Sequence, residues 1–359
     1  MIHTYNALDR FVHKAAFSGT GLQKAASRFE DMLFGDWISK TTLSRPVFIT
    51  SLPRAGTTLL LDLIVRVSGF YTHTYRHMPF VLSPMLWRQM SARFRKKSVP
   101  VPRAHGDGME IGFDSPEAFE EVVWLSFWKE KYAGSTIDLW SGSDSHPEFE
   151  CFFRDHMTKV VLSQACDNSD LRYVSKNNAN IARIPLLRRL FPDCLCIIPF
   201  REPLRQARSL QKQHLRFLNL HAADPFASQY MQSIGHFEFG DIRKHIDFPG
   251  LKEGADPRSI DYWLQYWTAA FAFILTGNLS NILFMDFDRL CIAPRESLGT
   301  LAAALRHPTA HKTLVAQASK ITPAVDYSDR EEFDAPSLNH ARRIYDILRA
   351  RTGQQLVAA

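Results

Sequence analysis

A short apolar run, a tight loop and an apolar helix follow one another near the amino end and constrain the fold more than any other feature. Residues 46–51 read PVFITS, a β-rich run, and residues 52–56 read LPRAG, with the Pro and Gly of a tight loop. A helical pattern begins at Thr57 and stops at Gly69. Such a turn presents free backbone N–H groups and the positive end of the helix dipole. The sequence therefore predicts an anion-binding turn in an α/β protein.

The side chains of this turn suit a phosphate group. Gly56 lets the backbone approach an anion closely, and Arg54 supplies charged N–H donors. Thr57 and Thr58 add hydroxyl donors. Gly and Thr are also common in ordinary strand-to-helix turns. The order Pro-Arg-Ala-Gly-Thr-Thr between a strand and an apolar helix nevertheless favours an anion site.

Strands and helices alternate along the rest of the chain. The apolar runs of strands are at 172–175, 194–200 and 281–286, and helical patterns cover 181–190, 204–215, 261–275, 294–306 and 336–352. This alternation predicts an α/β fold of three layers, with a mainly parallel β-sheet flanked by helices and a P-loop-like nucleotide-binding core.

The length of 359 residues suits a single domain, 1–359. We expect its core at about 46–306, amino-terminal helices at 5–34 and carboxy-terminal helices within 307–352. Residues 211–260 hold many aromatic, His and Gly residues without sustained periodicity, which is typical of a lid or acceptor-binding insertion.

Composition excludes several classes of protein. The net charge of +6, from 43 basic and 37 acidic residues, is too small and too scattered for a nucleic-acid-binding tail. The five cysteines lack the spacing of a disulfide framework or a metal site. The amino end has no signal-like apolar core, and the apolar run 269–275 is far too short for a membrane span. These features predict a cytoplasmic protein without a metal centre.

The turn at residues 51–58 resembles the 5′-phosphosulfate-binding loop of the sulfotransferases that use 3′-phosphoadenosine 5′-phosphosulfate (PAPS). The resemblance implies that the loop residues bind the donor, and that adenosine 3′,5′-bisphosphate is released without a required metal. Most relatives have Ser or another small residue where this chain has Ala55. The residues implied in donor binding here are Arg54, Ala55, Gly56, Thr57 and Thr58.

A second segment is similar to the same family. Arg201 directly follows the buried run CLCIIPF, and Ser209 lies eight residues later on the next helix. In the family, an Arg and a Ser in this order bind the 3′-phosphate of PAPS. The resemblance therefore implies this role for Arg201 and Ser209.

A third similarity is Lys176, in YVSKNNANI. A Lys at this place in the family contacts the sulfuryl group and its bridging oxygen, and its charge would offset the charge that builds on the leaving phosphate. A solvated surface Lys is the alternative. The cytosolic branch of the family has a His two residues after this Lys, where this chain has Asn178.

The acceptor's proton therefore needs another base, and the sequence leaves several open. His77 lies where other branches carry an acidic base, with Arg76 beside it. Glu117 and Glu120 fall three apart on a helix expected over 114–128, with Asp114 or Ser115 as its cap. His236 and Glu238 lie within the expected lid and suit either substrate binding or an exposed loop.

Two other functions compete with a sulfotransferase. A P-loop kinase or NTPase would have a glycine loop and an acid such as Asp286 after a strand, but the loop lacks the GK[ST] that such enzymes need. A non-catalytic nucleotide-binding protein would keep both loops without needing Lys176. The acceptor is expected to be a hydroxyl or amine of a carbohydrate, a lipid or a small metabolite, and the oligomeric state stays open.

Overall fold

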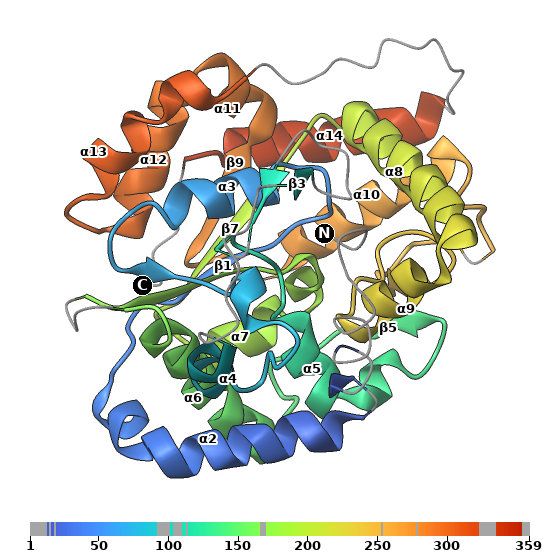
Figure 1. The fold of residues 1–359 in the computed structure, drawn as a ribbon. Helices are drawn as coiled ribbons and strands as arrows, with labels where there is room; N and C mark the ends of the chain where they lie inside the picture. Colours follow the sequence, from blue (N-terminus) through green and yellow to red (C-terminus); the bar gives the residue numbers. More distant parts are fainter. Residues whose placement is uncertain are drawn as a thin grey trace.

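The computed structural model describes residues 13, 16–17, 19–91, 101–102, 110–112, 114–165, 170–252, 254–277, 279–322 and 335–353. Its centre is a five-stranded sheet in the order β2-β6-β1-β7-β9 (Figure 1), and every neighbouring pair in it is parallel. The strands are β1 Val47–Ile49, β2 Phe70–Tyr71, β6 Arg172–Lys176, β7 Leu195–Phe200 and β9 Ile282–Asp286. Because the strands are parallel, all of them end at the same edge of the sheet.

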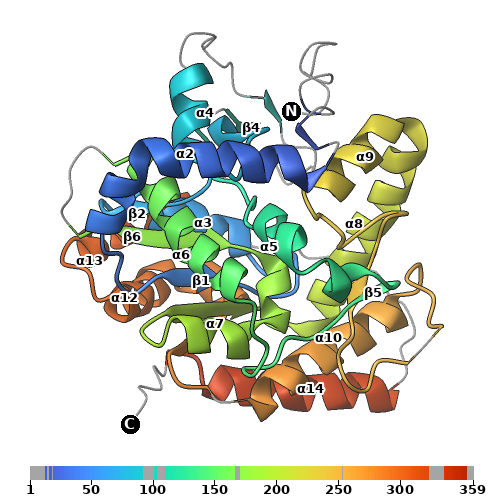
Figure 2. The same ribbon diagram turned by 90° about the horizontal axis from the view of Figure 1, so that it is seen from below.

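Helices cover both faces of this sheet (Figures 1 and 2). Successive strand residues point to opposite sides, so apolar side chains on both faces have to be covered. Val47 and Ile49 of β1 belong to one apolar core, and Phe48 between them belongs to the other. The first core is closed by α3 Thr57–Ile64, α12 Pro294–Leu305 and α13 Ala310–Val315. The second is closed by α5 Glu121–Phe127, α6 Pro147–Leu162, α7 Ile184–Leu190, α8 Pro203–Ala223, α10 Ile260–Thr276 and α14 Ala335–Ala350.

The remaining elements lie around these layers. Helix α2 Thr20–Lys40 lies against α6. The other helices are α4 Pro84–Ser91, α9 Pro225–Ser233 and α11 Phe287–Ile292. Two small sheets pair β3 Val101–Pro102 with β4 Glu110–Ile111, and β5 Thr136–Ile137 with β8 His245–Ile246. None of the helices in the described parts of the chain is long and apolar enough to cross a lipid bilayer.

The α/β fold predicted from the sequence is confirmed, including the strands at 172–175, 194–200 and 281–286. The helix expected over 114–128 is wrong in its first half, because α5 begins only at Glu121. Pro116 instead forms an isolated antiparallel bridge with Thr74, and the Glu117 N–H donates to the His73 carbonyl at 2.9 Å. Residues 116 and 117 are therefore hydrogen-bonded to residues 73 and 74, which follow β2, and Glu117 and Glu120 do not share a helix face.

Two boundaries also differ from expectation. The amino-terminal helix α2 runs on to Lys40, and the expected helical residues 5–12 lie outside the described residues. In the segment 211–260, α8 continues to Ala223 and α9 follows directly. Polar side chains such as His214 and His221 are buried on α8, which hid the helical period in the sequence.

Candidate active site

The turn between β1 and α3 has the backbone conformation of an anion-binding loop. Arg54 and Gly56 both have positive φ, at 70° and 87°. A Cβ atom on Gly56 would lie 2.2 Å from the ring of Phe287, so only glycine fits here. The turn ends at the amino end of the eight-residue helix α3, whose first N–H groups have no partners within the helix.

Side chains around this turn are tied to the end of the neighbouring strand β6. Thr57 Oγ1 donates to Asn178 Oδ1 at 3.3 Å, and Thr50 Oγ1 donates to the Asn178 carbonyl at 3.2 Å. Ser51 Oγ is buried and has no hydrogen-bond partner among the described residues. A buried hydroxyl of this kind is suited to donate to a bound anion.

The second predicted anion site lies beside the first. β7 pairs with β1 on the side opposite β6, so Arg201, which follows β7, emerges next to the turn. Arg54 Nε donates a hydrogen bond to Ser209 Oγ at 3.1 Å. The two segments therefore face one site.

Gln206, on α8, joins these segments and was missed in the sequence. Its Nε2 donates to the carbonyls of Leu52 at 3.2 Å and Pro53 at 2.9 Å. Its Oε1 accepts from the Arg201 N–H at 3.3 Å. The amide thus fixes the turn against the start of α8. Its sequence neighbourhood carries no signal for this role, because the carbonyls that it holds in the turn come from a segment about 150 positions away.

Acidic and aromatic side chains orient the Arg201 guanidinium. Its Nε lies 3.6 Å from Asp288 Oδ1, and its centre lies 5.7 Å from the centroid of the Phe287 ring. Arg205 Nη1 is 3.5 Å from the same Asp288 oxygen. Each of the two segments therefore carries an arginine, Arg54 in the turn and Arg201 after β7.

Lys176 is the last residue of β6 and pairs in register with Ile49 of β1. It is 8% exposed, so the surface alternative considered from the sequence is wrong. Its position places it at the carboxyl edge of the sheet, at the end of the strand next to β1 and its turn.

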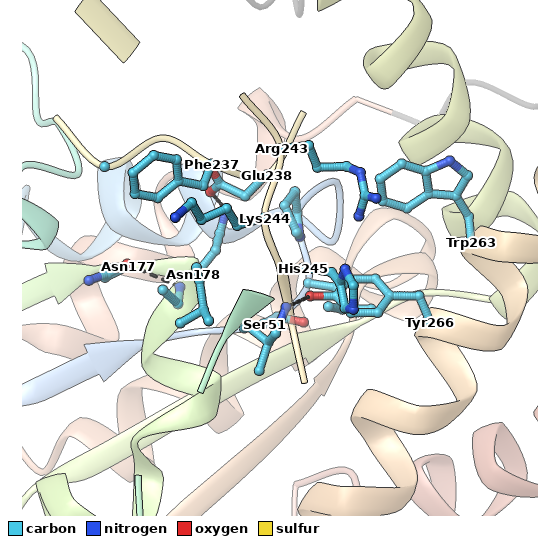
Figure 3. Close-up of a pocket in the computed structure, with 16 residues that line it drawn as sticks. Ser51, Asn177, Asn178, Phe237, Glu238, Arg243, Lys244, His245, Trp263 and Tyr266 are labelled. Carbon is cyan, nitrogen blue, oxygen red and sulfur yellow. Dashed lines mark hydrogen bonds between the residues drawn. The ribbon is translucent and has the colours of Figure 1, made fainter. Parts of the chain in front are cut away.

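A pocket opens beside this edge (Figure 3). Figure 3 shows Phe237, Glu238 and Lys244 on one side of it, and Trp263 and Tyr266 of α10 on the other. Its wall also includes Ser51, Leu52, Pro53, Ile137, Asn177, Asn178, Ala179, Gly235, Arg243, His245 and Ile246. The pocket therefore borders both the turn and the end of β6.

Glu238 is held at this pocket by two neighbours. Asn178 Nδ2 donates to Glu238 Oε1 at 3.1 Å, and His236 Nδ1 lies 3.0 Å from Oε2. Burial acts to raise the pKa of Glu238, but the charges of His236 and Lys176 and the Asn178 hydrogen bond outweigh it and lower the pKa. The carboxylate is therefore ionised at neutral pH.

The other base candidates lie elsewhere. His77 is buried, with Nδ1 accepting from the Thr74 N–H at 3.2 Å and Nε2 lying 3.1 Å from Ser163 Oγ. Burial, followed by the charge of Arg88, lowers the pKa of His77 to about 3. Its neighbour Arg76 pairs with Asp114. His77 is not among the residues that line the pocket.

Glu120 and Glu117 are likewise bound within the fold. Glu120 is 1% exposed and accepts hydrogen bonds from the Tyr173 hydroxyl at 2.9 Å and Asn180 Nδ2 at 2.7 Å. Glu117 accepts from the Tyr75 hydroxyl and, at 2.8 Å, from the Ala118 N–H. Neither carboxylate lines the pocket beside the turn after β1.

Comparisons with known proteins agree with this arrangement. A model of the sulfotransferase family matches residues 46–247, which is more than half of the chain and includes the turn, Lys176, Arg201 and Ser209. The chain therefore belongs to the sulfotransferase family. No curated protein matches the sequence closely enough to count as a relative.

One solved structure supports the likeness of the fold, and a second is reported beside it. Sulfotransferase STF9 from Mycobacterium avium is 13% identical, with a TM-score of 0.50 over 99% of this chain and 90% of that one. Sulfotransferase STF1 from Mycobacterium tuberculosis H37Rv is 15% identical, with a TM-score of 0.49 over 96% of this chain and 86% of that one. At such identities the likeness concerns the fold alone.

Proposed function

We propose that this chain transfers a sulfuryl group from PAPS to a hydroxyl or amine of a carbohydrate, lipid or small-metabolite acceptor. The observation that carries the proposal is the 3.1 Å hydrogen bond between Arg54 and Ser209. It joins the two segments that are expected to bind anions, and this supports one site for a donor with phosphate groups at both its 5′ and 3′ positions.

The turn fits the 5′-phosphosulfate end of the donor. Gly56 allows close approach, and the first N–H groups of α3 and the hydroxyls of Thr58 and Ser51 can donate hydrogen bonds to anionic oxygens, whereas the Thr57 hydroxyl donates to Asn178. Ala55 contributes its backbone only, and its buried methyl group packs inside. Arg201 and Ser209 fit the 3′-phosphate, with Arg201 already oriented by Asp288.

Lys176 supplies the electrostatic part of the reaction. As the acceptor oxygen bonds to sulfur, the bond from sulfur to the 5′-phosphate oxygen breaks, and negative charge collects on that phosphate. A buried ammonium at the edge of β6 stabilises this charge more strongly than a solvated one. Adenosine 3′,5′-bisphosphate leaves, and no metal ion takes part in the step as written.

The acceptor binds in the pocket beside the turn. Phe237, Trp263 and Tyr266 give it apolar and aromatic walls, while Glu238 and Arg243 give it polar ones. Such a mixture suits a hydroxylated molecule with an apolar or ring-shaped face. The pocket lies next to Ser51 and Asn178, so an acceptor in it would approach the sulfuryl group directly.

The test is transfer of radioactive sulfate from ³⁵S-labelled PAPS to a panel of sugars, phenols, lipids and amines. The proposal expects a labelled product and stoichiometric release of adenosine 3′,5′-bisphosphate with at least one class. ATP or GTP turnover without any release of the bisphosphate from PAPS would contradict it and favour a kinase or NTPase.

A further inference from the structure

A chain of polar contacts leads from the phosphate-binding turn to the acceptor pocket. It begins at Thr57, whose hydroxyl donates to Asn178 Oδ1 at 3.3 Å, and the amide of Asn178 donates to Glu238 Oε1 at 3.1 Å. His236 lies beyond, 3.0 Å from Oε2. Asn178 therefore couples the amino end of α3 to a carboxylate that lines the pocket.

We propose that Glu238 is the general base that removes the acceptor's proton, and that His236 is its positioning residue. This assignment rests on the proposed sulfuryl transfer. Of the two, Glu238 lines the pocket and His236 does not. His236 stacks on Phe217 with ring centroids 5.6 Å apart, which fixes its plane behind the carboxylate.

The surroundings of Glu238 suit this task. Its side chain lines the pocket and is 25% exposed, with Oε2 buried on the side of His236, whereas Glu120 is closed off inside the fold. The charge of Lys176, at the end of β6, helps to lower the pKa of Glu238, so the base and the leaving-group cation act on each other electrostatically. Asn178 cannot take up a proton itself, but its amide donor keeps the carboxylate aimed at the site.

The step balances in protons and electrons. The acceptor O–H bond breaks as its proton passes to a Glu238 carboxylate oxygen, and the acceptor oxygen forms its bond to sulfur. The electron pair of the broken S–O bond stays on the 5′-phosphate of the leaving bisphosphate. Glu238 then returns the proton to solvent, so that each turnover releases one proton.

Other charged groups around the pocket are committed to the fold. The Lys244 ammonium donates to the carbonyls of Tyr132 and, at 2.8 Å, Gly134. Arg243 donates to the Tyr262 hydroxyl at 2.6 Å. His245, on β8, lines the pocket and burial lowers its pKa. The groups that act on the charge of Glu238 are thus His236 and Lys176.

The test compares Glu238→Gln with the wild type, using ³⁵S-labelled PAPS with a series of substituted phenols and with water as the acceptor. Loss of a general base is expected to slow transfer by about 100-fold or more. The loss should grow as the phenol becomes less acidic, because acidic phenols ionise without help. Affinity for adenosine 3′,5′-bisphosphate should stay within about twofold, as no charged contact to the nucleotide is removed. The control Glu148→Gln, whose side chain is 59% exposed on α6, should match the wild type.

The variant His236→Asn tests the positioning role through the pH dependence of kcat, which a merely structural role of His236 would not change. Removing the imidazolium is expected to raise the pKa of Glu238 and to move the acidic limb of the kcat profile to higher pH. A Glu238→Gln enzyme that transfers to every phenol at the wild-type rate would overturn the assignment and leave the proposed function standing. A wild type that neither turns over PAPS nor binds the bisphosphate would overturn both.

Discussion

Arg54 Nε and Ser209 Oγ lie within hydrogen-bond distance, 3.1 Å, although 155 positions of sequence separate them. The contact exists because β1 and β7 are neighbours in the sheet and both end at the same edge. It joins the turn before α3 to the start of α8. The site of this sulfotransferase therefore consists of two segments that each carry an arginine toward a common space.

Replacing Arg54 by Ala is expected to weaken binding of adenosine 3′,5′-bisphosphate by about 10- to 100-fold, the effect of losing a charged hydrogen bond. Ser209→Ala should cost less, about 2- to 10-fold, because a neutral donor is lost. Titration calorimetry measures both. Arg66→Ala is the control, since Arg66 is exposed and pairs with Asp62 at the other end of α3.

The double variant tests the contact itself. Because Arg54 and Ser209 touch, the loss in Arg54→Ala/Ser209→Ala should be smaller than the sum of the single losses. Additive losses would mean that the two side chains act independently on the bisphosphate, against the coupling that their contact implies.

Replacing Lys176 by Met should lower turnover of PAPS by about 100-fold or more while the bisphosphate still binds. The ammonium acts on charge that develops only during transfer, so binding of the product depends on it less. Steady-state rates and calorimetry on the same sample separate the two effects, and Lys129→Met, at an exposed position, is the control. Full turnover in Lys176→Met would remove Lys176 from the mechanism and favour a different cation.

Gly56 and Gly250 form a matched pair for testing the turn. Both have φ of 87°, but a Cβ on Gly250 meets nothing within 4 Å, whereas one on Gly56 meets the Phe287 ring at 2.2 Å. Gly250→Ala should therefore lose about 1 kcal/mol of unfolding free energy from backbone strain alone. Gly56→Ala should lose about 2–4 kcal/mol, because overpacking adds to the strain. Equal losses in urea unfolding would contradict the close packing of the turn against α11.

Three buried histidines predict that stability falls in acid. Burial lowers the pKa of His73 and His156 well below the usual value. Neighbouring histidines add to this effect at His73, and Lys159 and His77 add to it at His156. Burial also lowers the pKa of His77, to about 3. The unfolded chain takes up protons below its ordinary histidine pKa of about 6.5, while these groups in the folded chain stay neutral. The contribution of these histidines to the free energy of unfolding is therefore fully present above about pH 6.5 and is lost as the pH falls below it.

Each of the three contributes up to about 1.4 kcal/mol per pH unit below that point. Urea unfolding between pH 5 and 8 measures the slope. His156→Gln should reduce the slope, and His311→Gln, which removes an exposed histidine, should not. An unfolding free energy that does not change between pH 7.5 and 5.5 would contradict the buried neutral cluster.

The two segments proposed to bind the donor stay a prediction as a binding site, but that they lie close together could be predicted from the sequence, because their signals are local. The turn before Thr57 and the pair Arg201 and Ser209 each lie within one strand-to-helix connection, where residue order fixes the geometry. Parallel pairing then brings the connections together, as the alternation of strands and helices implies. The same logic located Lys176 at the end of β6.

The choice of Glu238 as the proposed base could not be made from the sequence, because it depends on contacts between distant segments. Glu238 is fixed by Asn178, 60 positions away, in a stretch without clear periodicity. Glu120 and His77 looked equally suitable in the sequence, but their hydrogen-bond partners Tyr173 and Ser163 come from elsewhere in the chain. A polar residue that is satisfied inside the fold and one that faces substrate cannot be told apart until those partners are known.

The most direct measurement is calorimetry of the wild type with adenosine 3′,5′-bisphosphate, adenosine 5′-phosphate and ATP under the same conditions. If Arg54 and Arg201 bind the two phosphate ends of one nucleotide, the bisphosphate binds tightly, and losing the contacts to its 3′-phosphate weakens binding by about 100-fold or more. Tight binding of ATP together with no binding of the bisphosphate would contradict the account.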